Sequence, residues 1–220
     1  MGTNTNSAAI AVPGVPIAAE QLTIVPANTV PWADLQAIFG TADYPGRCYC
    51  QRLKTWEWHW SLTDQERRDR FRAQTNCDNP RATATTGLVA YLNTEHGGMA
   101  PVGWVAVEPR TRYPRLLKGR IVWHGRQEDR EDDGVWAVTC FCTRKGYRKR
   151  GLTYLLAAAT VGYARERGAR AIEGYPMIVP PGKKITWGEL YVGSREVFAA
   201  AGFIEVTHPS PRRVVMRIDF

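Results

Sequence analysis

The stretch CFCTRKGYRKRGLTYLL, Cys140–Leu156, decides how this chain folds. It starts in an apolar strand, passes through a basic turn, and becomes an apolar helix after Gly151. Five of the seven residues from Arg144 to Arg150 are Arg or Lys. The first N–H groups of a helix have no partner within the helix and bind anions, and glycine lets the backbone approach a ligand closely. The stretch therefore predicts a diphosphate-binding turn.

A nucleoside triphosphatase loop is the main alternative for this turn. Gly146, Gly151 and Thr153 have the outer spacing of such a loop. The position before Thr153 is Leu152, however, where the loop needs the lysine that reaches the outer phosphates. The sequence therefore argues against a triphosphatase.

The segments around the turn alternate between strand and helix patterns. Helices are predicted over 31–40, 64–74 and 151–168, with a shorter one over 194–202. Thr63 and Glu66 have the spacing of a capping box, and Ser194 is predicted to cap the last helix. Strands are predicted over 21–27, 86–92, 101–108, 135–142, 171–176, 203–208 and 212–220. This order predicts an α/β (α+β) chain with a mixed sheet.

Length and composition are those of an ordinary globular protein. The 220 residues are 44% hydrophobic and 23% charged, with a mean hydropathy of -0.33. Residues 1–19 are predicted to be a flexible leader, and residues 20–220 a single domain. The N-terminus has no basic start, and no apolar run approaches the roughly 20 residues of a membrane span. We therefore expect a cytoplasmic protein.

The net charge indicates the kind of partner, and the cysteine count indicates the redox state of the thiols. The chain has 29 Lys and Arg against 21 Asp and Glu, a formal net charge of +8. This charge favours anionic partners, but it does not choose between nucleic acid, an acidic protein, a membrane surface and a phosphate-rich cofactor. Five cysteines, an odd number, favour reduced thiols.

Two motifs together resemble the GNAT acetyltransferase superfamily. In YRKRGLT, residues Arg148, Gly151 and Thr153 match its acyl-CoA signature Arg/Gln-x-x-Gly-x-Gly/Ala, with Thr replacing Gly or Ala. The later EVFAAAGF, 196–203, resembles the closing helix and Gly-Phe of the superfamily. The resemblance covers about 86–206 and is most specific over 135–176.

The resemblance implies a mostly antiparallel sheet of about seven strands with flanking helices, and acetyl-CoA as co-substrate. Backbone N–H groups from Arg148 to Thr153 would hold the pyrophosphate, and an N–H near Cys140–Cys142 would polarise the thioester carbonyl. The predicted cofactor-binding residues are Thr139, Cys140, Phe141, Cys142, Arg148, Lys149, Arg150, Gly151, Leu152, Thr153, Ser194 and Phe198.

The acid and base of the reaction are harder to assign. Many relatives place a tyrosine acid where this chain has Phe198, so Tyr191 and Tyr175 are the substitutes predicted here. Glu173, expected to face the cofactor cleft with a pKa raised by burial, is the first candidate base, and Glu108 the second. Ordinary half-buried tyrosines and surface carboxylates remain the alternative.

RCYCQRLKTWEWHW, Arg47–Trp60, combines two cysteines with three tryptophans and a histidine. The C-x-C spacing is tighter than that of structural zinc sites, so no metal is predicted. In extended chain Trp56, Trp58 and Trp60 share one face. In the superfamily the corresponding region borders the acceptor site, so the three rings are predicted to bind the acceptor. The alternative is that one or two of them belong to the hydrophobic core.

We therefore predict an N-acetyltransferase that works in a ternary complex without metal. The acceptor would be an amine on a small molecule or a protein. Nucleic acid and membrane are not expected as partners, and the chain would be a monomer or homodimer. The alternative is a non-catalytic module of the same fold that senses CoA or a nucleic acid.

Overall fold

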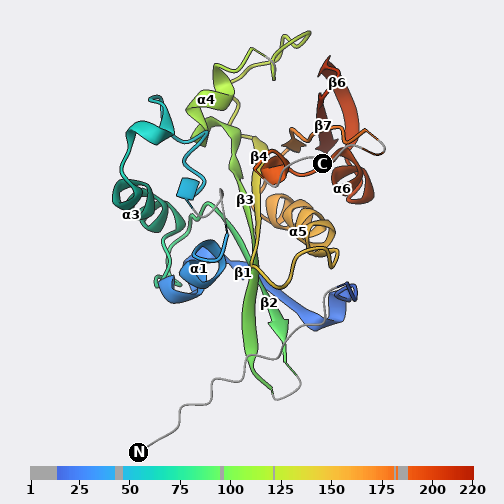
Figure 1. Ribbon diagram of the computed structural model, residues 1–220. Coiled ribbons are helices and arrows are strands. Elements are labelled where there is room, and N and C mark those ends of the chain that lie inside the picture. Colours follow the sequence, from blue (N-terminus) through green and yellow to red (C-terminus); the bar gives the residue numbers. More distant parts are fainter. Residues whose placement is uncertain (1–13, 43–46, 95–96, 121, 181, 183–187) are drawn as a thin grey trace, which may run out of the picture.

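A computed structural model describes residues 14–42, 47–94, 97–120, 122–180, 182 and 188–220. Its centre is a seven-stranded sheet in the order β1-β2-β3-β4-β5-β7-β6 (Figure 1). Only β4 and β5 run parallel, and every other neighbouring pair is antiparallel. The strands are β1 Leu22–Pro26, β2 Gly87–Asn93, β3 Met99–Pro109, β4 Val135–Thr143, β5 Ala171–Gly174, β6 Ile204–Ser210 and β7 Arg213–Asp219. The predicted fold class is confirmed.

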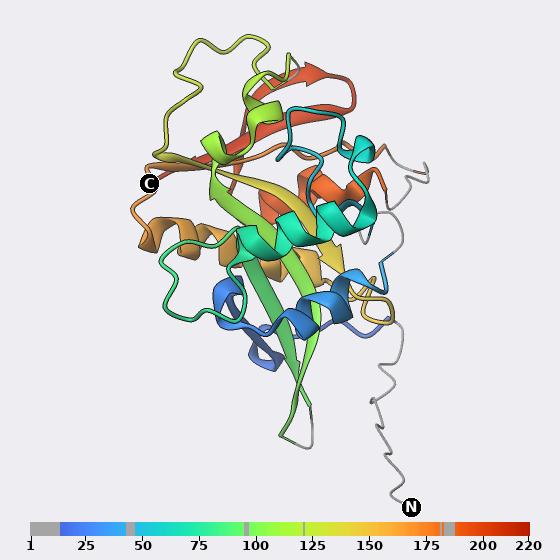
Figure 2. The ribbon, with the colours of Figure 1, turned by 90° about the vertical axis from the view of Figure 1, so that its left-hand side faces the viewer.

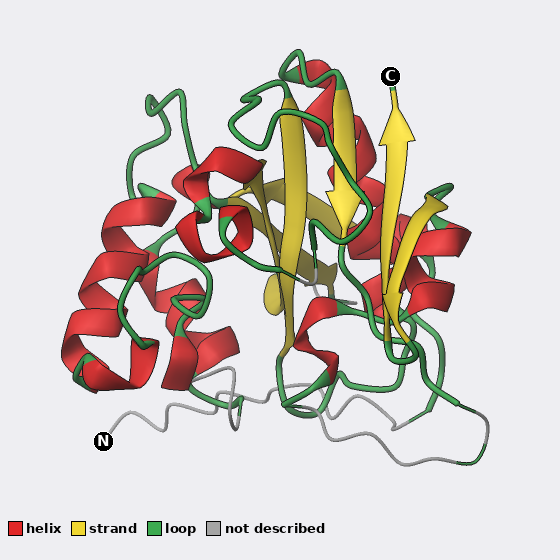
Figure 3. Ribbon diagram, turned by 90° about the horizontal axis from the view of Figure 1, so that it is seen from above, coloured by secondary structure: helices red, strands yellow, loops and turns green. Residues whose placement is uncertain are grey.

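Helices cover both faces of the sheet (Figure 3). The α-helices are α1 Trp32–Phe39, α3 Asp64–Thr75, α4 Pro114–Leu117, α5 Leu152–Glu166 and α6 Arg195–Ala200. Short 3-10 helices are η1 Ala19–Gln21, η2 Ala27–Thr29, η3 His59–Ser61, η4 Arg110–Arg112 and η5 Leu190–Val192. Helices α1 and α3 cross one face (Figure 2), and α5 and α6 cover the other.

Helix α5 packs tightly on β3 because of one glycine. A side chain added at Gly103 would collide with Leu152 and Leu156, the residues that α5 buries against the sheet. The predicted helix over 151–168 is confirmed, with Gly151 as its N-cap in the left-handed conformation at φ +78°. This contact fixes the start of α5, and hence the basic turn, against the sheet.

On the opposite face, aromatic rings join α1 and α3 to the sheet. Phe71 lies 4.7 Å from Phe39 and 5.1 Å from Trp104 between ring centroids. The capping box of α3 is confirmed, since the Thr63 hydroxyl accepts from the Glu66 N–H at 3.2 Å and the Glu66 carboxylate accepts from the Thr63 N–H at 2.7 Å.

Two details differ from the sequence expectations. The fifth strand ends at Gly174, short of the predicted residue 176, and Ser194 stands at the N-cap of α6 without a side-chain capping bond. None of the helices in the described ranges is long and apolar enough to cross a bilayer.

Candidate active site

The basic turn has the backbone of an anion site. Lys149 and Gly151 both have positive φ, 61° and 78°, with Arg150 between them. Left-handed residues alternating in this way make successive N–H groups point into one concavity, which binds anions. Gly151 is also the N-cap of α5, so the positive end of the helix dipole adds to the same concavity.

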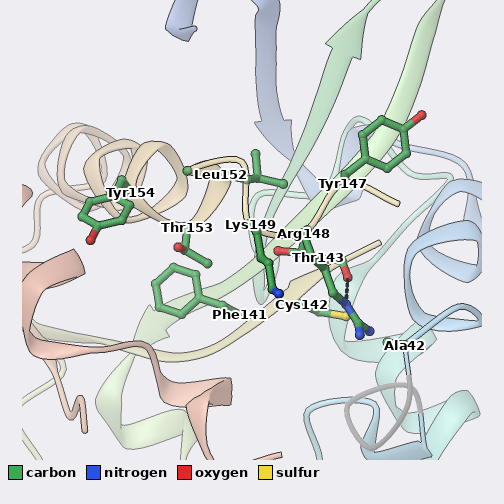
Figure 4. Close-up of a pocket in the computed structure, with 11 residues that line it drawn as sticks. Ala42, Phe141, Cys142, Thr143, Tyr147, Arg148, Lys149, Leu152, Thr153 and Tyr154 are labelled. Carbon is green, nitrogen blue, oxygen red and sulfur yellow. Dashed lines mark hydrogen bonds between the residues drawn. The ribbon is translucent and has the colours of Figure 1, made fainter. Parts of the chain in front are cut away.

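A cavity of about 340 Å³ opens in front of this turn (Figure 4). Arg148 and Lys149 both extend into the space shown there, and the Arg148 Nε donates to the Thr143 carbonyl at 3.4 Å. The cavity brings together seven of the predicted cofactor-binding residues: Phe141, Cys142, Arg148, Lys149, Gly151, Leu152 and Thr153. Ala42, Thr143, Tyr147 and Tyr154 complete its lining.

The Arg150 side chain does not line this cavity. Its side chain is buried, and its Nε donates to the Val15 carbonyl at 2.7 Å, while the Arg150 carbonyl accepts from the Ile17 N–H at 3.0 Å. The end of the segment predicted as a flexible leader is thus held against the turn; residues 1–13 lie outside the described residues. Arg150 anchors the turn rather than lining its cavity.

A splay between two parallel strands leads away from the turn. β4 and β5 pair as far as Val138 and Gly174, where β5 ends, whereas β4 continues to Thr143. The register between β4 and β3 shifts at Thr139, which has no β3 partner within the described sheet. We call the stretch Thr139–Thr143 the free edge of β4. Unpaired backbone groups on such an edge can bond to an extended polar ligand.

Phe198 fills the base of this splay. Side chains added at Gly174 or Gly193 would collide with its ring, which also lies 5.9 Å from Phe141 and 5.0 Å from Phe203 between centroids. Neither Phe198 nor Ser194, both predicted to bind cofactor, is among the residues that line the cavity at the basic turn.

Two adjoining cavities, which we call together the acceptor cavity, lie at the Thr139 end of the free edge. Their volumes are about 180 Å³ and 20 Å³. They share Leu53, Thr139 and Tyr191, and Cys140 lines the smaller one. Burial raises the pKa of Tyr191 above its usual range, so its hydroxyl is a proton donor at neutral pH.

Glu173 is buried in a network of arginines. Its carboxylate pairs with Arg217 at 2.8 Å, with Arg110 at 3.4 Å and with Arg126, and it accepts from the Tyr175 hydroxyl at 2.8 Å. The predicted burial is found, but Glu173 lines neither the cavity at the basic turn nor the acceptor cavity. Among the described residues, the Glu173 carboxylate is thus surrounded by three guanidinium groups and one phenol.

Glu108 lies near the end of β3 and does not line the acceptor cavity. It pairs with Lys54, accepts from the Thr86 hydroxyl, and lines a separate open cavity of about 720 Å³. The buried hydroxyl of Tyr113 lacks a hydrogen-bond partner of normal geometry among the described residues. Burial and then the charge of Glu108 raise the Tyr113 pKa well above its usual range.

The tryptophans of the 47–60 stretch do not form an extended stripe, because none of the residues from 51 to 61 lies in a strand and His59–Ser61 is a 3-10 helix. Trp56 and Trp58 are 58% and 52% exposed, so the core alternative fails for both. Each ring instead covers a cation: Trp56 faces Lys118, Trp58 faces Arg115, and Trp60 faces Arg67. They line neither part of the acceptor cavity, so their binding of the acceptor stays a prediction.

His59 is packed between two of these rings. It is 0% exposed, and neither ring nitrogen bonds to a described residue. Its ring centroid lies 4.7 Å from that of Trp58 and 4.5 Å from that of Trp60. Burial, with Arg52 and Arg115 nearby, lowers its pKa to about 4, so it is neutral at pH 7.

No sequence pattern pointed to two further cavity residues, Arg52 and Arg213. Arg52 lines the smaller part of the acceptor cavity and Arg213 the larger part. They come from the loop before α3 and from the start of β7, and only the folded chain brings them together.

Comparisons with known proteins agree with this architecture. The sequence model described as the acetyltransferase (GNAT) family matches residues 50–174. No curated protein sequence matches the chain.

Several solved structures have a similar fold. An acetyltransferase (GNAT family) from Bacillus anthracis is 13% identical with a TM-score of 0.50, covering 92% of this chain and 97% of that one. A GCN5-related N-acetyltransferase from Kribbella flavida is 17% identical with a TM-score of 0.50, covering 92% and 100%. An N-acetyltransferase from Staphylococcus aureus Mu50 is 10% identical with a TM-score of 0.50, covering 90% and 98%.

Proposed function

Because this chain belongs to the acetyltransferase (GNAT) family of enzymes, we propose that it transfers an acetyl group from acetyl-CoA to an amine. The observation that supports this most strongly is the free edge of β4. It has an anion-binding turn at one end and the acceptor cavity at the other. An extended thioester with a diphosphate would fit along this edge.

In this arrangement the N–H groups of Lys149–Thr153 hold the pyrophosphate, and Arg148 and Lys149 add positive charge. The pantetheine arm runs along the free edge. The thioester carbonyl then lies near the Thr139 and Cys140 N–H groups, where the register between β4 and β3 shifts. Donors held at that position stabilise the negative charge that develops on the carbonyl oxygen.

The amine attacks from the acceptor cavity in its neutral form. Its nitrogen bonds to the carbonyl carbon, and the carbon–sulfur bond then breaks. The Tyr191 hydroxyl gives its proton to the departing sulfur and recovers one from the nitrogen, so the products are an amide and free CoA. Tyr175 is less suited to this role, because its hydroxyl already donates to Glu173.

The roles of Glu173 and Glu108 as bases stay predictions, as does the absence of a metal. The cytoplasmic location, the lack of nucleic-acid and membrane partners, and the monomeric or homodimeric state also stay predictions. Within the described residues, no three His, Cys, Asp or Glu side chains are grouped to hold a metal ion.

Thiol release from acetyl-CoA tests the proposal. The protein would be incubated with acetyl-CoA and a panel of amines that covers amino acids, aryl and alkyl amines, and peptides. We expect thiol release with at least one amine and an equal amount of its acetamide, measured by mass spectrometry. Calorimetric binding of acetyl-CoA without release across the panel would instead support the non-catalytic sensor, and no binding would contradict both.

A further inference from the structure

Two guanidinium groups line the acceptor cavity, those of Arg52 and Arg213. None of the described residues that line it carries a carboxylate. The Arg52 Cζ lies 4.8 Å from the ring centroid of Tyr191, and Arg213 lines the larger part of the cavity together with the same tyrosine. Arg213 donates one hydrogen bond, from Nη1 to the Tyr175 carbonyl at 3.3 Å. Neither arginine forms an ion pair with any described residue. Since a guanidinium carries five N–H donors, most of this capacity is unused.

This arrangement differs from that of the three arginines around Glu173. Arg110, Arg126 and Arg217 all pair with Glu173. Burial lowers the pKa of Arg213 below its usual value; the positive charges of Arg52 and Arg212 lower it further, whereas Tyr191 and Glu189 act in the opposite direction. Unpaired cations that lie together in a half-buried site are destabilised, and an anion bound between them would offset that cost.

The anion cannot be a phosphate of the cofactor in the arrangement proposed above. The anion-binding turn, at Lys149–Gly151, lies past the Thr143 end of the free edge, whereas Arg52 and Arg213 lie at the Thr139 end. An anion between the two arginines therefore belongs to the acceptor.

The rest of the acceptor cavity is apolar and small. Its larger part is lined by Leu53, Leu116, Val122, Val192, Val214 and Val215, and its volume is about 180 Å³. Apolar walls with a few polar groups at fixed positions are typical of small-molecule sites. The size suits a molecule on the scale of one amino acid.

We propose that the acceptor is a small amine that carries a carboxylate and an apolar side chain, as an apolar amino acid does. The carboxylate lies between Arg52 and Arg213, the side chain contacts the leucines and valines, and the amine reaches the thioester beside Tyr191. This inference rests on the proposed function and names its substrate class.

Matched pairs of acceptors test the role of the carboxylate. L-Leucine would be compared with isopentylamine, and L-phenylalanine with 2-phenylethylamine, which lack only the carboxylate. Each pair is assayed at equal concentrations of the neutral amine. We expect kcat/KM to be at least about tenfold higher for the amino acid, since hydrogen bonds to charged groups are the strong ones.

Variants of Arg213 and Arg52 test whether these two residues bind the carboxylate of the acceptor. Arg213→Gln and Arg52→Gln should each lower the ratio of the two kcat/KM values about tenfold or more, and Arg213→Lys should retain part of it. Arg212→Gln is the matched control, because Arg212 is the exposed neighbour of Arg213 and pairs with Glu189 at 2.8 Å. Equal use of both members of a pair, or equal losses for both in the Arg213 and Arg52 variants, would overturn the inference.

A binding measurement separates this inference from the proposed function. 4-Methylpentanoate, which is leucine without its amine, would be added to the CoA-loaded protein and followed by ligand-observed NMR beside 4-methylpentanamide. We expect the carboxylate to bind, the amide to bind more weakly, and Arg213→Gln to abolish the difference. If no amine is acetylated but this difference holds, the proposed function fails and the anion site stands; if both probes bind alike, or neither binds, the anion site is refuted.

Discussion

Tyr191 and Phe198 differ in what their side chains can do for a leaving thiolate. Phe198, at the position where many relatives have a tyrosine, has no hydroxyl, and its ring fills the splay beside Gly174 and Gly193. Tyr191 lies on η5, which packs against β4, and its side chain lines both parts of the acceptor cavity. The loss of a hydroxyl at residue 198 thus coincides with a half-buried phenol at Tyr191.

Replacing Tyr191 with Phe should lower kcat about 10- to 100-fold and leave the Kd of acetyl-CoA unchanged, because general acid catalysis is lost while the cofactor cleft is intact. The pH dependence adds a second test. Burial raises the pKa of Tyr191 above the usual value of 10.0, so the proton donor is present up to that pH and is lost only above it. In steady-state kinetics the wild-type kcat should not fall as pH rises towards 10. A kcat equal to wild type in the Tyr191→Phe variant would remove Tyr191 from the mechanism.

At the scale of elements, the turn before α5 carries the cofactor site. A side chain at Gly151 would meet no neighbouring atom, so the only demand for glycine there is its positive φ of 78°. Arg150 holds the turn from behind through Val15 and Ile17. The backbone is therefore fixed by conformation and by hydrogen bonds, not by close packing.

Gly151→Ala should raise the Kd of acetyl-CoA about tenfold, because a left-handed alanine is strained by about 1–2 kcal/mol and the turn would relax away from the anion-binding geometry. Calorimetry gives the Kd, and urea unfolding gives the change in stability. Gly162→Ala is the control: Gly162 is exposed within α5 with open space around it, so it should leave the Kd unchanged and stabilise the helix slightly. Equal Kd values for both variants would contradict the role of the turn.

The elements of this site were predictable from sequence to different degrees. The strand, basic turn and helix of 140–156 are consecutive, so a local pattern contains the anion site almost completely. The tryptophan stripe failed because alternation places side chains on one face only in extended chain, whereas residues 56–60 turn, and each ring covers a nearby cation. Glu173 was correctly expected to be buried, but the three arginines around it come from distant segments that no local pattern connects to it.

At the scale of the whole molecule, the site exists because two parallel strands separate. Residues from the loop before α3, from β4, from η5 and from β7 converge where they part. The sequence predicted the seven-stranded sheet and its flanking helices, since each strand and helix has its own periodicity and the family resemblance supplied their order. It could not predict that Arg52 and Arg213 would line cavities that share Tyr191, because residues from the loop before α3 and from β7 meet there only in the folded chain.

The central claim is that acetyl-CoA lies along the free edge of β4, and a crystal structure of the complex with acetyl-CoA tests it most directly. We expect the pyrophosphate at the N–H groups of Lys149–Thr153, and the thioester carbonyl beside Thr139 and Cys140, with its carbon open to the acceptor cavity at Tyr191. Acetyl-CoA bound away from this edge, or with its acetyl group turned away from Tyr191, would contradict the account.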